Sequence, residues 1–171
     1  MKTLLFVIVS CAVAFSSPCQ SLARDWQTYE NSRFGFQFNY PAFVFHPGEG
    51  AANNDGQQFY GSDDQVIIIA FGRYNVLELT PKAYLDSVKS DSNLIERVTY
   101  ERVARDWVAV SGFVGQDVYY EKTIFSCSGE VLNSLVLVYS ADLKPKIDPL
   151  VGPITKSLTP GVGYGTPEDC Q

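Results

Sequence analysis

The chain has few of the side chains that most metal sites and hydrolytic sites require. Among 171 residues there is 1 histidine, and there are only 4 cysteines. Zinc is held by three or four ligands from histidine, cysteine and carboxylates at short spacings, and a hydrolytic triad needs a base beside its nucleophile. His46 is the sole imidazole, and no G-x-S-x-G elbow accompanies it. The sequence therefore predicts no metal site, no cofactor and no catalytic triad.

Basic residues are also scarce, and they form no cluster along the chain. The 13 lysines and arginines stand against 19 acidic residues, which gives a net charge of −6. Proteins that bind nucleic acid or anionic lipid usually present a basic patch or stripe. We therefore expect no nucleic acid among the partners, and we expect another protein or a component of the cell envelope.

No apolar run of the chain is long enough to cross a bilayer. The longest, residues 4–15, would rise about 18 Å as a helix, whereas the hydrocarbon core is about 30 Å thick. It follows Lys2 and is succeeded by Ser21-Leu22-Ala23, whose small residues suit signal peptidase. This pattern predicts a signal peptide over residues 1–23 and a periplasmic or secreted protein beginning at Arg24.

A lipoprotein signal is the alternative interpretation of the same segment. Ile8-Val9-Ser10-Cys11 formally matches a lipobox, in which Cys11 would be acylated and become the N-terminus. The apolar run continues past that cysteine, so the segment upstream is unusually short, and Cys19 is a poorer match. We therefore favour cleavage after Ala23.

The first part of the remaining chain has the period of β-strands. Residues 26–29 and 34–40 alternate on either side of a polar turn, and the second segment reads F-G-F-Q-F-N-Y up to Pro41. This pattern predicts a hairpin that lays four rings on the core: Phe34, Phe36, Phe38 and Tyr40. The polar, glycine-rich stretch from His46 to Gly56 is expected to be a long loop.

Seven further elements follow from period and capping signals. Residues 57–60 and 65–72 predict a second hairpin, whose apolar stretch 66–71 is typical of a central strand. Thr80-Pro81 predicts the start of a helix that buries Tyr84, Leu85 and Val88 and ends near Ser90 to Ser92. Four strands are expected at 94–104, 107–114, 117–127 and 130–139.

A second helix is expected near the C-terminus. Ile147, Leu150, Ile154 and Leu158 are among the apolar residues at helical spacing. Pro149 and Pro153 lie inside this pattern, so the helix is expected to begin late or to kink at Pro153. Together the elements predict a single α+β domain over residues 24–160, with a mainly antiparallel sheet of six to seven strands and at least two helices.

The layout resembles that of small exported bacterial proteins with a PsbP-like α/β/α sandwich fold. The resemblance is carried by W-x-x-Y-x-N-x-R-F-G-F-x-F-x-Y-P at residues 26–41, a D-G hairpin, "RVTYERVARDWVAVSGFVGQDVYYEK" at residues 97–122, and a late helix. The fold is named for an extrinsic photosystem subunit and is shared by a Ran-binding nuclear import factor. The resemblance implies binding of other macromolecules without catalysis, and it carries no site residues.

Acidic residues offer the remaining candidates for chemistry. Asp55 and Asp63-Asp64 suit tight turns and lack the spacing of a calcium loop. Glu101, Asp117 and Glu121 fall on predicted strands, where a pair on one face would resemble the carboxylates of a glycosidase. The glycine-rich stretch 161–165 lacks the lysine and the helix start of a phosphate-binding loop.

Aromatic residues allow two interpretations. Rings at strand period are far more often core than ligand platform, and the stripe at residues 34–40 is interpreted as core. Tyrosine favours interfaces, so an exposed tyrosine surface is the second possibility. Its candidate members are Tyr29, Tyr60, Tyr74, Tyr100, Tyr119 and Tyr120.

Two cysteines remain after signal cleavage. Cys127 lies at a predicted turn, and Cys170 is the penultimate residue of a flexible tail spanning residues 161–171. In an oxidising compartment they are expected to form a disulfide that holds this tail; free thiols or an intermolecular bridge are the alternatives. We thus expect an exported, non-enzymatic accessory or binding domain, and the alternative is a hydrolase with an unrecognised carboxylate site.

Overall fold

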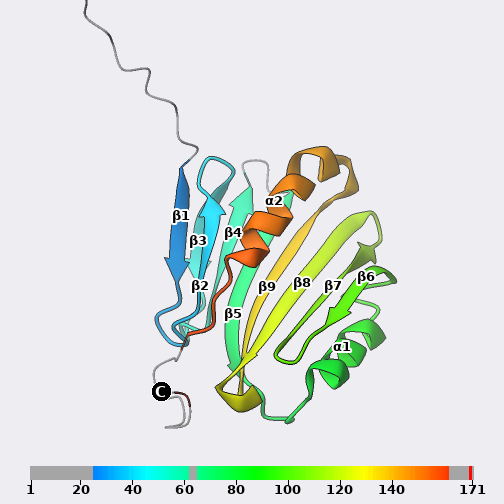
Figure 1. The fold of residues 1–171 in the computed structure, drawn as a ribbon. Helices are drawn as coiled ribbons and strands as arrows, with labels where there is room; N and C mark the ends of the chain where they lie inside the picture. The colour runs from blue at the N-terminus through cyan, green and yellow to red at the C-terminus, as the bar shows by residue number, and fades with distance from the viewer. Residues whose placement is uncertain (1–24, 62–64, 162–169, 171) are drawn as a thin grey trace, which may run out of the picture.

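The computed structural model describes residues 25–61, 65–161 and 170. In this part of the chain there are one seven-stranded antiparallel sheet, with strand order β3-β4-β5-β9-β8-β7-β6, and a separate β1-β2 hairpin (Figure 1). The strands are β1 (Trp26–Glu30), β2 (Gln37–Pro41), β3 (Phe45–Gly50), β4 (Gly56–Gly61), β5 (Val66–Tyr74), β6 (Arg97–Val103), β7 (Trp107–Val114), β8 (Asp117–Ser126) and β9 (Val131–Ser140). The α-helices are α1 (Pro81–Ser90) and α2 (Lys144–Lys156), and short 3-10 helices span Cys127–Gly129 and Ala141–Leu143. The predicted signal peptide and most of the predicted tail lie outside the described residues.

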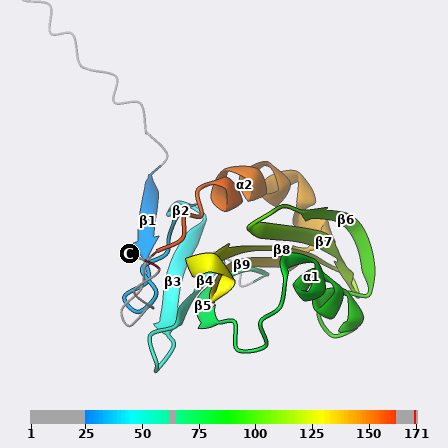
Figure 2. The ribbon, with the colours of Figure 1, turned by 60° about the horizontal axis from the view of Figure 1, so that its bottom comes forward.

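The two helices pack on opposite faces of the large sheet (Figure 2). Side chains alternate along each strand, so β8 sends Val118 and Ile124 to the face covered by α2 and Tyr119 and Phe125 to the face covered by α1. We call these the α2 face and the α1 face. The predicted α+β sandwich with a mainly antiparallel sheet is confirmed.

The β1-β2 hairpin also packs on the α2 face, and it supplies the aromatic stripe predicted from the sequence. Phe36 and Phe38 are fully buried, and the Phe38 ring meets the Phe59 ring edge to face with centroids 5.3 Å apart. Burying rings of this size contributes roughly 2–3 kcal/mol each. The interpretation of the stripe as core is therefore confirmed.

The second strand of this hairpin begins later than predicted. The chain turns between β1 and β2, where the Asn31 side chain accepts from the amides of Arg33 and Phe34 and Gly35 has φ of 70°. Phe34 and Phe36 are therefore buried, but they lie in the segment between the two strands and not in β2. Tight-turn hydrogen bonds replace strand pairing here because asparagine and glycine suit them.

The prediction of a loop between His46 and Gly56 is wrong over the first half of this segment. His46 to Gly50 belong to β3, which pairs with β4 at the edge of the sheet with a register shift between Pro47 and Gly50. An edge strand exposes most of its side chains, so it needs no apolar alternation and is difficult to recognise from sequence. The turn itself is short and places Asn54 at a positive φ of 58°.

The helices follow their capping signals, with one correction. At the start of α1 the Thr80 hydroxyl accepts from the amide of Ala83 at 3.2 Å, as predicted. The expected late start of α2 is wrong, because the helix runs from Lys144 through both internal prolines. Pro145, Pro149 and Pro153 are spaced by four residues, and all three are exposed. Proline has no amide hydrogen to donate, so the donors that α2 lacks are all on its solvent-facing side.

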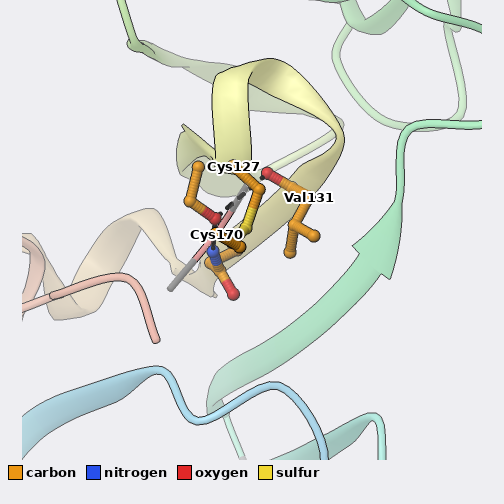
Figure 3. The surroundings of a disulfide bond; sticks show 5 residues. Cys127, Val131 and Cys170 are labelled. Atoms are coloured by element: carbon orange, nitrogen blue, oxygen red, sulfur yellow. Dashed lines mark hydrogen bonds between the residues drawn. A yellow bond between two sulfur atoms is a disulfide. The ribbon is translucent and has the colours of Figure 1, made fainter. Parts of the chain in front are cut away.

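The structure pairs Cys127 and Cys170 in a disulfide (Figure 3). Cys127 lies in the turn between β8 and β9, and the two Cα atoms are 4.6 Å apart. The bridge attaches the end of the chain beside Val131, the first residue of β9, as Figure 3 shows. The predicted pairing is confirmed.

Candidate functional site

The α1 face carries a cleft of about 560 Å³ beside the helix. On this face α1 lies mainly over β6 and β7, and Ile69, Phe71 and Val138 of β5 and β9 remain half-buried. The apolar part of its floor is formed by Ile69, Phe71, Val136 and Val138, while Ser87, Val88 and Asp91 of α1 form one wall. The hollow continues past Ile69 and Phe71 towards Gln58 and Tyr60 on β4. We call the part beside the helix the α1 cleft.

A buried carboxylate lies at the base of the α1 cleft. Glu121 of β8 is 3% exposed, and its Oε1 accepts hydrogen bonds from the Tyr84 hydroxyl at 2.5 Å and from Thr123 at 2.8 Å. Its Oε2 accepts from the Tyr119 hydroxyl. Alternation along β8 places residues 119, 121 and 123 on one face, and α1 brings Tyr84 to them.

This cluster behaves as an anchor between helix and sheet. Burial, followed by the neighbouring charge of Glu121, raises the pKa of Tyr84 to about 12, and the same causes raise the pKa of Tyr119. Both hydroxyls therefore remain protonated donors across the physiological range. Glu121 thus accepts hydrogen bonds from hydroxyl groups on both of its oxygens, and Tyr84 links it directly to α1.

The predicted carboxylate pair is partly assembled. Glu101 and Glu121 are both register partners of Val110, so they lie on the α1 face two strands, or about 10 Å, apart. Lys89 of α1 binds Glu101 at 2.5 Å, and Glu121 is bound by Tyr84. Each carboxylate thus meets a different side chain of α1. Asp117 is exposed at the start of β8 and does not join them.

One cation lines the cleft and was missed by sequence reasoning. The Arg73 guanidinium lies 5.4 Å from the centroid of the Tyr84 ring and 5.9 Å from that of Phe71. In the described part of the chain no carboxylate forms an ion pair with it. Arg73 follows the apolar stretch of β5, and nothing in the sequence places α1 beside it.

The other predicted candidates are dispersed. His46 is exposed on β3, and Asp55 accepts from the Asn53 amide at 2.6 Å within its turn. Asp63, Asp64 and residues 162–165 lie outside the described residues. Among residues that the structure describes, no group of three or more histidine, cysteine or acidic side chains is close enough to hold a metal ion.

The predicted tyrosine surface is not formed as a single patch. Tyr119 is buried, and Tyr29 packs against Phe36, Phe38 and Phe59. Tyr60 lies on β4 and Tyr100 on β6, near opposite edges of the sheet.

Within the described ranges, no helix is long and apolar enough to span a membrane.

Comparison with known proteins identifies the fold. The chain is similar to the solution structure of the cyanobacterial PsbP protein CyanoP from Synechocystis sp. PCC 6803, with a TM-score of 0.58 over 85% of this chain and 98% of that one. The fold is PsbP-like. Sequence identity is 13%, so the likeness establishes the fold alone. No protein-family model and no curated protein sequence matches the chain.

Proposed function

We propose that this protein is an exported, non-enzymatic binding domain that holds an apolar group of its partner in the α1 cleft. The observation that carries the proposal is the incomplete cover of the α1 face. Ile69, Phe71 and Val138 are only half-buried, although each lies in a central strand of the sheet. Half-buried apolar side chains at the floor of a cleft are typical of binding sites.

The chemistry of the cleft favours binding over catalysis. Its buried carboxylate is occupied by three hydroxyl donors. Glu101 is exposed and paired with Lys89. General acid–base catalysis needs a group within reach of the substrate and free to exchange a proton. The tendency of PsbP-like proteins to bind macromolecules without catalysis, which the sequence resemblance implies, supports the same conclusion.

Export is part of the proposal and rests on the predicted signal peptide. A disulfide between Cys127 and Cys170 supports an oxidising compartment, because such bonds persist in the periplasm and outside the cell. N-terminal sequencing of the exported protein tests this step. The expected first residue is Arg24, whereas an acylated Cys11 at the N-terminus would replace the soluble form with a lipoprotein.

Two helix variants test the role of the cleft. Ser87 and Ser90 are both exposed on α1, and each hydroxyl donates to the backbone carbonyl three residues earlier. Ser87 lines the cleft, and Ser90 does not. Ser87→Trp therefore fills the cleft. Ser90→Trp is a matched control, because it also removes a serine hydroxyl from α1 and adds the same indole ring.

The measurement is capture of partners from an envelope extract by the immobilised mature protein, read by mass spectrometry. A partner retained by wild type and by Ser90→Trp but lost with Ser87→Trp supports the proposal. A partner retained equally by both variants contradicts the cleft as the binding site. Turnover of ester, glycoside or peptide substrates that is abolished by Glu121→Gln would establish the hydrolase instead.

A further inference from the structure

A second surface lies on the opposite side of the sheet from the α1 cleft. On the α2 face, the helix and the hairpin leave β6, β7 and the neighbouring part of β8 uncovered, as Figure 1 shows to one side of α2. Register puts Arg102, Ala109 and Lys122 in one row across three strands. Tyr100, Ser111 and Tyr120 form the next row.

Three cations on this surface are held against aromatic rings. The guanidinium of Arg97 lies 4.3 Å from the centroid of the Phe113 ring, and that of Arg102 lies 5.2 Å from Trp107. The ammonium of Lys122 lies 5.7 Å from the same Trp107 ring. We call Arg97, Arg102, Lys122 and the rings that they contact the cationic face.

No carboxylate of the described residues forms an ion pair with these three cations. In an acidic chain with a net charge of −6, three unpaired cations on one sheet face are a marked local excess of positive charge. Lys122 contributes from an interior strand and is half-buried, and its ammonium donates to the Thr155 carbonyl of α2 at 2.8 Å. Charges that merely protect an edge strand from aggregation do not extend inward in this way.

The shape of the surface selects among anionic partners. α2 borders the cationic face directly through Thr155, and a helix is about 10 Å thick. Lys122 therefore lies at the base of a step, which keeps a flat bilayer away from its ammonium group. A single extended polypeptide chain is narrow enough to enter, and planar guanidinium groups bind carboxylates in a bidentate geometry.

We propose that the cationic face binds an extended acidic segment of a partner protein. Arg97 and Arg102 pair with Phe113 and Ala109, four residues apart on β7, which corresponds to about 13 Å along the strand. Two acidic side chains four residues apart in an extended segment have the same spacing and point to the same side. Tyr100 lies between the two arginines and packs against the residue midway between the acids.

The test uses a labelled peptide in which two glutamates are separated by three residues with a valine in the middle. A peptide of the same composition with adjacent glutamates is the control, and binding is measured by fluorescence anisotropy at low salt. We expect the first peptide to bind more tightly. The variant Arg97→Glu/Arg102→Glu is expected to weaken its binding at least about tenfold.

Matched variants separate this surface from general charge and from the cleft. Arg105→Glu changes the charge of an exposed arginine in the turn after β6 and is expected to leave binding unchanged, as is Ser87→Trp. Circular dichroism checks folding, and Arg102→Ala alone replaces the double variant if that variant does not fold. The proposal is overturned if neither peptide binds, if both bind equally, or if Arg105→Glu has the same effect. Binding of phosphatidylglycerol vesicles without binding of the peptide would assign the surface to a membrane.

Discussion

Removing one hydroxyl group tests the anchor between α1 and the sheet. Tyr84 is 3% exposed, its ring meets Phe125 edge to face, and its hydroxyl donates to Glu121. Tyr84→Phe keeps the ring and removes that donor, together with the acceptor that the hydroxyl offers to Thr123 at 3.4 Å. A hydrogen bond to a charged group contributes about 1.5–3 kcal/mol, so we expect the free energy of unfolding at neutral pH to fall by about 2 kcal/mol.

The same substitution changes the dependence of stability on pH. Tyr84 has a pKa of about 12 in the folded protein against 10.0 when unperturbed, because burial and the charge of Glu121 oppose ionisation. A group whose pKa is raised on folding contributes stability that is fully present below its unfolded pKa and is lost as the pH rises through its folded pKa. The window is therefore pH 10 to 12, and two pKa units correspond to at most about 2.7 kcal/mol.

Urea denaturation at neutral pH and at a series of values above pH 10 measures both effects. Tyr40→Phe is the control, because that buried hydroxyl donates to the neutral amide oxygen of Gln27 at 2.9 Å. Its loss is expected to cost about 1 kcal/mol, as is usual for neutral hydrogen bonds. The reasoning is refuted if Tyr84→Phe costs no more than the control, or if the stability of the Tyr84→Phe variant falls as steeply as that of wild type above pH 10.

Three further predictions concern other parts of the fold. Replacing Cys127 and Cys170 by serine opens a loop with a sequence separation of 43 residues and is expected to cost about 4 kcal/mol in the chain-entropy model, measured as a lower urea midpoint; equal midpoints with and without the bridge would contradict it. Pro149→Ala restores an amide donor on the exposed side of α2 and is expected to raise stability by about 1–2 kcal/mol, and thermal unfolding at or below the wild-type temperature would count against this. Gly112→Ala places a Cβ 2.1 Å from the Arg97 carbonyl oxygen and is expected to lower the yield of folded protein, whereas wild-type stability would show that β6 adjusts to it.

Local signals in the sequence were sufficient for much of the fold. The capping threonine at residue 80, the alternation of residues 34–40 and the short turns between β6 and β9 all depend on near neighbours, and they predicted α1, the aromatic stripe and the antiparallel order. The disulfide was predicted because only two cysteines remained after the expected cleavage. Such inferences succeed because near neighbours in the chain set helix caps, turns and strand alternation.

Local signals failed where pairing with distant residues decides the structure. β3 has no apolar alternation and is a strand only because β4 lies beside it. The prolines of α2 predicted a shorter helix, but burial of Ile147 and Ile154 on the other side holds the helix together. In both cases tertiary packing outweighs local preference.

Both candidate surfaces were decided by tertiary structure alone. Alternation along β8 places Tyr119 and Glu121 on one side, but only the fold brings Tyr84 from α1 to complete the anchor. Arg97, Arg102 and Lys122 are scattered in a sequence that shows no basic cluster, and strand register gathers them on one face. The sequence by itself determined most of the elements and the burial of the aromatic stripe and of the apolar side of α1. The positions of charges relative to one another across the sheet depend on the register of strands distant in the chain, and only the folded protein sets that register.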